Sequence, residues 1–197
     1  MAFWSDSTVE PKRQFRWLLY LPTDTGESGA AAIQTYLVKT VTKPSWTMTE
    51  TAVNFMIHTF KYPGRVTWNN VSVTLVDSID PDTSGILNKI FQSSGYRIPD
   101  TEESAIFSFS KSSAINSLGT PRLVQIDAGG NEAGTGPVSP REIEEWTMVN
   151  AWVNKVSFGS LDYAGDGLSE VQLDISYDYA HYKGDFQRNR KELKSIL

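Results

Sequence analysis

Cysteine is absent from all 197 residues. Its absence excludes disulfides, thiol nucleophiles and cysteine-based zinc sites, and it fits a reducing compartment. Long apolar runs are missing as well, since no stretch approaches the 18 residues or so that a membrane-spanning helix needs. The opening residues, MAFWSDSTVEPKRQF, lack the basic start and apolar run of a signal peptide. We therefore expect a protein without a membrane anchor that stays in the cytoplasm where it is made.

Positive charge is scarce outside one segment. The net charge is −5, yet residues 183–197 carry five basic and two acidic side chains, which leaves −8 for the other 182 residues. Because gripping duplex DNA requires Lys and Arg to neutralise phosphates, such an acidic body is expected to repel DNA. The length and the 40% hydrophobic fraction fit one well-buried domain. We expect that domain to span 1–182, followed by a basic extension over 183–197.

Two segments alternate between apolar and polar residues. In RVTWNNVSVTLVD (65–77), the side chains of Val71, Val73 and Leu75 would point to one side, and Ser72 and Thr74 to the other. The segment VQLDISYDYAHY (171–182) continues the pattern as one long strand, with Val171, Leu173, Ile175, Tyr177 and Tyr179 opposite Gln172, Asp174, Ser176 and Asp178. A period of two with one apolar side is typical of strands in an antiparallel sheet.

Further strands are expected over 13–22, 33–46, 50–64 and 144–159, and a weaker one over 104–115. The third would end in a Tyr62-Pro63-Gly64 turn. Residues 80–96 change period, because Ile86, Leu87, Ile90 and Phe91 would share one face of a helix. An arm over 1–12 and a variable region at about 97–140 complete the chain. The predicted fold class is mainly β (α+β): an antiparallel β-sandwich or barrel with one flanking α-helix, an N-terminal arm and a C-terminal extension.

Residues suited to catalysis are few. His58 and His181 have no acid–nucleophile pattern near them in the sequence, although a catalytic triad is defined by space rather than by order. The glycine-rich segment 127–140 lacks the Gly-Lys-Ser/Thr ending of a phosphate-binding loop, and a surface loop is the favoured interpretation. We expect no catalytic residue and no cofactor.

Acidic side chains and tryptophans leave two further alternatives. Asp174 and Asp178 lie four apart on the expected strand, about 13 Å from each other, which is too far to share a metal ion. With Asp127, Asp162 and Asp166 they are interpreted as solvated acids, and we expect no metal. The six tryptophans could bind sugar rings if several were exposed on one face, but a core or interface role is commoner. They are Trp4, Trp17, Trp46, Trp68, Trp146 and Trp152.

Read in order, the segments resemble a known family. RQFRWLLYLP (13–22), YLVKTVTKPSW (36–46), FKYPGRVTWNNVSVTLVD (60–77) and the run from Glu144 to Tyr182 are similar in pattern and order to the tail tube proteins of T4-type contractile-tailed bacteriophages. The resemblance covers 13–96 and 144–182. It implies a small β-sandwich or barrel with a helix, a fold that the ring protein Hcp of type VI secretion shares.

The resemblance also implies a structural role in the virion tail, after assembly in the host cytoplasm. Family members form hexameric rings that stack into a hollow tube inside a sheath, so the implied partners are copies of the chain, the sheath, the baseplate and the tail terminator. Genomic DNA would pass through without specific binding, and no membrane is involved. A baseplate tube-initiator, the inner tube of a phage-like or type VI injection device, and a carbohydrate-binding module remain as alternatives.

Three sets of residues follow as candidates. A polar, acidic wall suits sliding DNA, because like charge disfavours adsorption; the expected lumen-facing residues are Gln172, Asp174, Ser176 and Asp178. The arm and a loop at 47–64 would bridge successive rings, through Phe3, Trp4, Thr49, Phe55 and His58. The basic extension would contact the sheath or a neighbouring ring, through Arg188, Arg190, Lys191 and Lys194.

Overall fold

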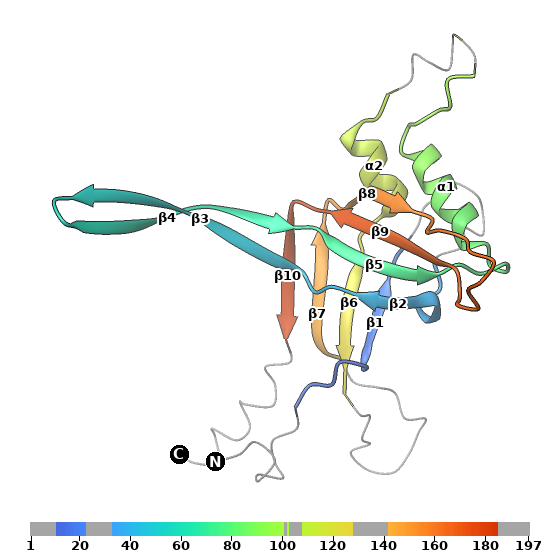
Figure 1. Cartoon of the computed structure of the whole chain (residues 1–197), viewed down its shortest axis with the longest axis horizontal. Coiled ribbons are helices and arrows are strands. Elements are labelled where there is room, and N and C mark those ends of the chain that lie inside the picture. The colour runs from blue at the N-terminus through green and yellow to red at the C-terminus, as the bar shows by residue number, and fades with distance from the viewer. Residues whose placement is uncertain (1–10, 23–32, 101, 103–107, 128–141, 185–197) are drawn as a thin grey trace.

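A computed structural model describes residues 11–22, 33–100, 102, 108–127 and 142–184. Its core is two four-stranded antiparallel sheets, and a separate two-stranded hairpin projects from them (Figure 1). The first sheet has the strand order β1-β6-β7-β10, made by β1 (Trp17–Tyr20), β6 (Arg122–Ile126), β7 (Glu142–Val149) and β10 (Tyr179–Gly184). The second has the order β2-β5-β9-β8, made by β2 (Val38–Val41), β5 (Val71–Val76), β9 (Glu170–Ser176) and β8 (Trp152–Ser157).

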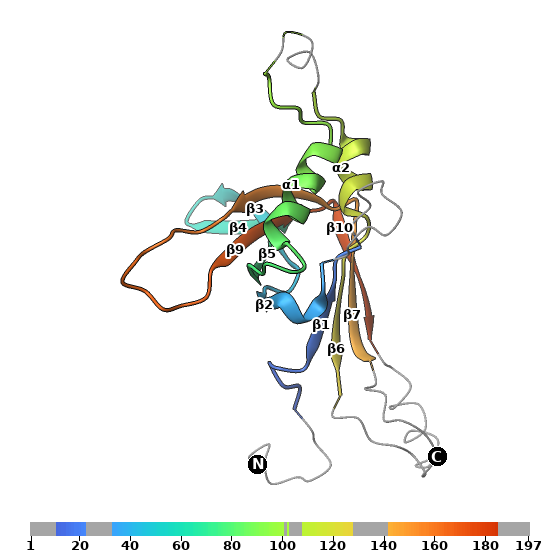
Figure 2. The same ribbon diagram turned by 90° about the vertical axis from the view of Figure 1, so that its right-hand side faces the viewer.

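Strands of the two sheets run across one another (Figures 1 and 2). Two segments of the chain belong to both sheets: β7 leads into β8 through Asn150 and Ala151, and β9 leads into β10 through Tyr177 and Asp178. The expected single strands over 144–159 and 171–182 are therefore wrong, because each breaks where it changes sheets. Strands that switch sheets at a corner are a known feature of crossed sheet packing.

The core lies between the sheets and is closed at one end by helices. Val71, Val73 and Leu75 of β5 are at most 1% exposed, which confirms the inward side predicted for 65–77. Val171, Leu173 and Ile175 of β9 are buried beside them, and Leu19, Leu123 and Met148 contribute from the first sheet. Each such side chain contributes up to about 1.5–3 kcal/mol on burial. Tyr179, expected on the inward side, is exposed because it follows the break.

Two α-helices occur in the described residues, where the sequence predicted one. The expected helix is α1 (Thr83–Ser93), which begins where the Asp82 side chain accepts a hydrogen bond from the Gly85 N–H. The second, α2 (Lys111–Leu118), is capped by Ser110 and overlaps the weak strand expected over 104–115, which is wrong from 111 onward. α2 packs on α1 and on β8. No described helix has the length and apolar character needed to cross a membrane.

The hairpin consists of β3 (Ser45–Phe55) and β4 (His58–Asn69), joined by Met56 and Ile57. The turn expected at Tyr62-Pro63-Gly64 is wrong, because these residues lie inside β4. Gly64 sits at an irregularity opposite Thr49, where an added Cβ would lie 2.8 Å from the Thr49 carbonyl oxygen. A glycine at this close approach marks a β-bulge rather than a chain reversal.

The second sheet and the hairpin form one continuous ribbon. β2 pairs with β5, β3 pairs with β4, and only Asn70 separates β4 from β5. The Thr42 N–H donates to the Ser72 carbonyl oxygen at 3.0 Å, where the ribbon leaves the sheet. A short 3₁₀-helix, η2 (Thr35–Leu37), precedes β2. The strand expected over 33–46 is thus divided among a 3₁₀-turn and two strands.

Both sheets have free edges among the strands described, so the body is a sandwich rather than a closed barrel. β6, which the sequence did not lead us to expect, is a central strand and lies within the region 97–140. The arm up to residue 10, the glycine-rich stretch 128–140 and residues 185–197 lie outside the described residues. Lys183 and Gly184, assigned above to the extension, complete β10.

Candidate assembly interface

The projecting hairpin carries its apolar side chains on different faces in its two halves. Directly paired residues share a face of an antiparallel ribbon. Near the body the apolar pairs are Trp46–Trp68 and Met48–Val66. Beyond the bulge the strand alternation places the apolar and aromatic residues on the opposite face, where the pairs are Thr51–Tyr62, Val53–Phe60 and Phe55–His58.

Polar residues occupy the other face of the outer half. Lys61 donates to a carboxylate oxygen of Glu50 at 2.7 Å, and the Thr59 hydroxyl donates to Asn54 Oδ1 at 2.9 Å. Both pairs are exposed, so they contribute little to stability. Their position shows that the outer half is amphipathic, with one face suited to water and one suited to contact.

The tip of the hairpin is apolar and strained. Met56 and Ile57, which form the turn, are 85% and 91% exposed, and Phe55 beside them is 63% exposed. Met56 has a φ of 55°, in the left-handed region that glycine and asparagine adopt most easily. An exposed apolar turn made by a residue in a costly conformation is a candidate contact site.

In the inner half of the hairpin, Trp68 has a neighbour in its own chain, whereas Trp46, Met48 and Val66 are 54%, 46% and 49% exposed. The ring of Trp68 lies 5.9 Å from that of Tyr177, and Trp68 packs against the core. The outer apolar face lies on the opposite side of the ribbon, and its side chains are about half exposed, with Val53 at 49%, Phe60 at 51% and Tyr62 at 58%. An isolated two-stranded hairpin is marginally stable in water. This face is therefore the clearest interaction surface of the described residues.

Three of the expected inter-ring residues lie on this hairpin. Thr49 is at the bulge, where its hydroxyl accepts a hydrogen bond from the Arg65 N–H at 2.9 Å, and Phe55 and His58 form the last pair before the tip. Phe3 and Trp4 lie outside the described residues. Met56, Ile57 and the change of face were not predicted, although the alternation of Thr51, Val53 and Phe55 into an apolar turn could have signalled them.

The outer side of the second sheet is polar. Gln172 and Asp174 of β9 point away from the core, and the Ser72 hydroxyl donates to Asp174 at 2.6 Å across the strands. Lys155 of β8 stands opposite Asp174 in the register, so the wall is mixed rather than purely acidic. Ser176 ends β9 and donates to Asn70 at 2.9 Å. The assignment of these three residues to a lumen stays a prediction.

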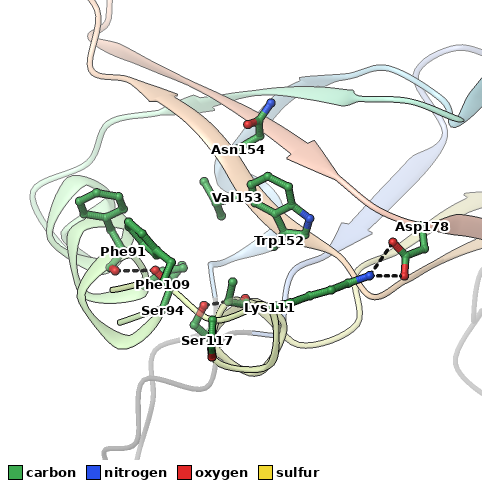
Figure 3. A pocket seen from close by; sticks show the side chains of 12 residues that line it. Phe91, Ser94, Phe109, Lys111, Ser117, Trp152, Val153, Asn154 and Asp178 are labelled. Carbon is green, nitrogen blue, oxygen red and sulfur yellow. Dashed lines mark hydrogen bonds and ion pairs between the residues drawn. The ribbon is translucent and has the colours of Figure 1, made fainter. Parts of the chain in front are cut away.

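Asp178 does not continue this row, contrary to the expectation that it shares a strand face with Asp174. It lies between β9 and β10 and accepts hydrogen bonds from Lys111 at 2.7 Å (Figure 3) and from the Asn150 amide at 2.7 Å. The hydrogen bonds from Lys111 and Asn150 lower the pKa of Asp178 below its usual value. The carboxylate ties α2 to the corner where the chain changes sheets.

A pocket of about 690 Å³ opens beside this ion pair, between the two helices and β8 (Figure 3). Its apolar lining includes Ile90, Phe91, Phe109, Trp152 and Val153. The rings of Phe91 and Phe109 lie 5.6 Å apart. The Lys111–Asp178 pair stands at its edge, and the Ser94 and Ser117 hydroxyls in the lining donate to helix carbonyl oxygens at 2.6 and 2.8 Å. Because these polar groups are paired with one another or with the backbone, the pocket offers a ligand mainly apolar side chains.

Within the described ranges, each histidine lies beside an aromatic ring rather than a second catalytic group. His58 is in the hairpin with its ring 6.4 Å from that of Phe60, whereas His181 is in β10 with its ring 5.2 Å from that of Tyr179. In the parts of the chain that the structure describes, no three His, Asp or Glu side chains gather as a metal site requires. Trp46 is the one strongly exposed tryptophan of those described, at 54%, so no tryptophan platform for sugars is formed there.

A buried carboxylate fixes the root of the hairpin. Glu144 of β7 is 6% exposed and pairs with Lys12, which precedes β1, and with Lys43, which precedes β3, at 2.7 Å. The Trp146 indole N–H also donates to it at 2.6 Å. Burial raises the pKa of Glu144, but the hydrogen bonds from Lys12, Lys43 and Trp146 outweigh it and lower the pKa to about 2. One charge thus connects the N-terminal segment, the first sheet and the hairpin.

Open sheet edges provide further surfaces for association. In the described strands, β1 and β10 border the first sheet and β2 and β8 border the second. Edge strands present unpaired N–H and C=O groups that another chain can pair with. The expected basic contacts Arg188, Arg190, Lys191 and Lys194 lie outside the described residues.

No protein-family model matches the chain, and no curated protein does. Solved structures match at the level of the fold. A chain of the anti-feeding prophage (AFP) baseplate is 9% identical, with a TM-score of 0.60 over 89% of this chain and 97% of that one. A chain of the sheath/tube terminator of the extracellular contractile injection system PVC is 13% identical, with a TM-score of 0.51 over 90% and 100%. A chain of the AFP tube-terminating cap is also 13% identical, with a TM-score of 0.51 over 93% and 99%.

These likenesses show the fold. The two crossed sheets, the helices and the projecting hairpin have the architecture of chains found in contractile injection assemblies. The fold implied by the resemblance to tail tube proteins is thus confirmed, with a second helix and with free sheet edges.

Proposed function

We propose that this chain is a structural subunit that self-assembles into rings stacked as the hollow inner tube of a contractile injection particle. The observation that carries the proposal is the β3–β4 hairpin, which projects from the two sheets (Figure 1). Its outer apolar face and tip are exposed, because the body of the same subunit does not reach them. In the assembly, a neighbouring copy packs against the outer apolar face and tip of the hairpin and buries them. Because hairpin and body are different surfaces, the contact is head-to-tail, and a head-to-tail contact that closes makes a ring.

Several finer features belong to the same proposal. The ring is hexameric, which the six-fold symmetry of the matched AFP baseplate structure supports. The tube lies inside the sheath of a contractile phage tail, starts at a baseplate, ends at a terminator and passes genomic DNA. The outer side of the second sheet, with Gln172, Asp174 and Ser176, lines the lumen, where small polar groups offer no stacking surface to bases. Thr49, Phe55 and His58 contact the next ring, and the basic residues at 188–194 contact the sheath or a neighbouring ring.

A subunit at one end of the tube is the second candidate. The observation that favours it is the origin of the matched chains, which come from a baseplate, a sheath/tube terminator and a tube-terminating cap. Such a subunit would form one ring and stop, whereas a tube subunit adds rings without limit. The inner tube of a phage-like or type VI device would behave as a tube subunit does, so the nature of the particle is a separate question.

The test is to remove the apolar outer face without disturbing the monomer. Phe55→Ser combined with Phe60→Ser should abolish rings and tubes, because it removes two exposed aromatic anchors. The matched control is Glu50→Gln with Lys61→Gln, which changes the polar face of the same half. Sedimentation velocity measures the outcome across a concentration series, and circular dichroism checks the fold. Unchanged assembly of the serine variant, or equal loss in both variants, would refute the role of this face.

A further inference from the structure

A second groove lies between the first sheet and the β2 edge of the second sheet, with a volume of about 940 Å³. It is lined by Trp17, Leu123 and Trp146 from the first sheet, by Val38 and Val41 from β2, and by polar residues, among which the lysines are exposed and Gln125 is buried. Those polar residues are Lys12, Gln14, Thr35, Lys39, Thr40, Lys43 and Gln125. The groove therefore has an aromatic floor and a basic rim.

The rim has an excess of positive charge, although the chain as a whole carries −5. Lys12 and Lys43 share the single carboxylate of Glu144, so one positive charge remains uncompensated in that trio. Lys39 pairs with Glu170 at an exposed position, where screening by water makes the pair weak. No carboxylate is among the described residues that line the groove. An acidic occupant would complete this charge balance.

The aromatic side chains of the groove are incompletely buried within the described residues of the subunit. Phe15, at the mouth, is 76% exposed, and its face is contacted by the Arg16 guanidinium 5.5 Å from the ring centre. Trp17 and Trp146 pack against the core but are only partly buried. Aromatic rings set in a basic groove fit a segment that combines aromatic and acidic residues.

Residues 1–10 of this same chain have that composition. The sequence MAFWSDSTVE contains two adjacent aromatics, Phe3 and Trp4, two carboxylates, Asp6 and Glu10, and no basic side chain. We propose that this arm, coming from a neighbouring copy, lies in the groove, with Phe3 and Trp4 against the aromatic floor and its carboxylates toward the lysines. The inference rests on the proposed function, because it names the contact by which one copy of the tube holds the next.

Chain geometry favours a neighbour's arm over the chain's own. Pro11 follows the arm directly and disfavours a helical turn at Glu10, so the chain is directed to continue extended there. The segment from Trp17 to Lys12 already lines the groove, so an arm that stays extended beyond Pro11 leads past the groove of its own chain. Ten extended residues span up to about 33–36 Å, which is enough to reach another copy.

The absence of cysteine makes a clean cross-linking test possible. Ser5→Cys places one thiol in the arm, and Thr40→Cys places one at an exposed position in the groove. Equal amounts of the two single variants are mixed under assembly conditions and treated with a short bismaleimide. The expected product is a species of twice the chain mass that contains one chain of each kind. The matched control pairs Ser5→Cys with Asn154→Cys, an exposed position on the opposite edge strand β8, and should link at least about tenfold less.

A second measurement does not depend on where the two thiols lie. Phe3→Ser with Trp4→Ser should raise the protein concentration at half-assembly by about tenfold or more, while Ser5→Ala with Ser7→Ala leaves it unchanged. Absence of the mixed product together with an unchanged midpoint would overturn the inference. Two other results would also overturn it. One is cross-linking within a chain that carries both Ser5→Cys and Thr40→Cys but none between chains. The other is cross-linking of Ser5→Cys to Asn154→Cys that equals its cross-linking to Thr40→Cys. If tubes form normally in these cases, the proposed function survives and only the arm contact fails; a wild-type chain that never assembles would remove both.

Discussion

Asn150 and Asp178 are joined at the corner where both long segments of the chain pass from one sheet to the other. The Asn150 amide donates to the Asp178 carboxylate at 2.7 Å, and the Asp178 N–H donates to the Val149 carbonyl oxygen at 3.1 Å. Asn150 has a φ of 54°, which asparagine tolerates better than other residues with a Cβ. The pair thus holds two bends in register and fixes how the sheets cross.

Two substitutions of Asn150 should separate the cost of its positive φ from the contribution of its side-chain hydrogen bond to the unfolding free energy. Asn150→Gly removes the amide but accepts the positive φ, so it should cost about 1 kcal/mol of unfolding free energy. Asn150→Ala loses the same hydrogen bond and adds strain, so it should cost about 1–2 kcal/mol more. Urea unfolding of both variants measures the difference. Equal stability of the two would show that the backbone conformation at this position is not costly.

Acid should weaken the root of the hairpin through Glu144. Its pKa falls from 4.5 in the unfolded chain to about 2 in the folded protein. A carboxyl whose folded pKa is depressed stabilises the protein fully above its unfolded pKa, and this stability is lost as pH falls through the folded pKa. We expect a loss on the order of 2–3 kcal/mol between about pH 4.5 and pH 2, measured by urea unfolding across this range.

Two variants identify the source of that acid sensitivity. Glu144→Gln should remove much of the slope with pH and lower the stability at pH 7, because it leaves Lys12 and Lys43 without their carboxylate. Glu170→Gln breaks the exposed pair with Lys39 and should change the stability by under about 1 kcal/mol. A pH dependence that is the same in Glu144→Gln as in the wild type would assign the effect to other carboxylates.

The hairpin tip should show opposite effects on the subunit and on its assembly. Met56→Gly relieves a positive φ, so the isolated subunit should gain about 1 kcal/mol of stability. The same change removes an exposed apolar side chain, so the concentration needed for assembly should rise. Met56→Ala keeps the strain and serves as the control. Thermal unfolding and sedimentation are measured on the same samples, and a tip without a role in assembly would leave sedimentation unaltered.

Lysine on the outer side of the second sheet should slow the passage of DNA. Gln172→Lys with Asp174→Lys would place two positive charges on the proposed lumen wall, where phosphates adsorb to them. Particles carrying these subunits should assemble normally and eject their genome more slowly, an effect that added salt reduces. Lysine at Asn154, in β8 beside the helix pocket, is the control. Ejection at the normal rate in the double variant would move the lumen to another face.

Parts of the fold that depend on local pattern were predictable from the sequence. Val71, Val73 and Leu75 alternate because β5 has one buried side, and Ile86, Leu87 and Ile90 mark α1 because a helix buries one stripe. Register and corners were not predictable in the same way. The alternation in 171–182 continues through Tyr177 and Asp178, so nothing in its period reveals that the strand changes sheets there.

The candidate interface was predictable only in part, for a related reason. Phe55 and His58 were identified, but the Tyr62-Pro63-Gly64 sequence has the composition of a turn, and only the pairing with β3 shows it to be a bulged strand. Once the turn moves to Met56 and Ile57, every residue of β4 acquires a different partner and the apolar face changes side. Likewise, α2 begins with a serine-rich stretch whose helical character rests on the Ser110 cap and on packing against α1 and β8.

The most direct test of self-assembly is negative-stain electron microscopy of the purified wild-type chain over a concentration series, with analytical ultracentrifugation of the same samples. The account predicts rings with an open centre that stack into tubes as the concentration rises, because the hairpin face finds its cover only on another copy. Particles that remain monomeric at every concentration, with the hairpin exposed throughout, would contradict it.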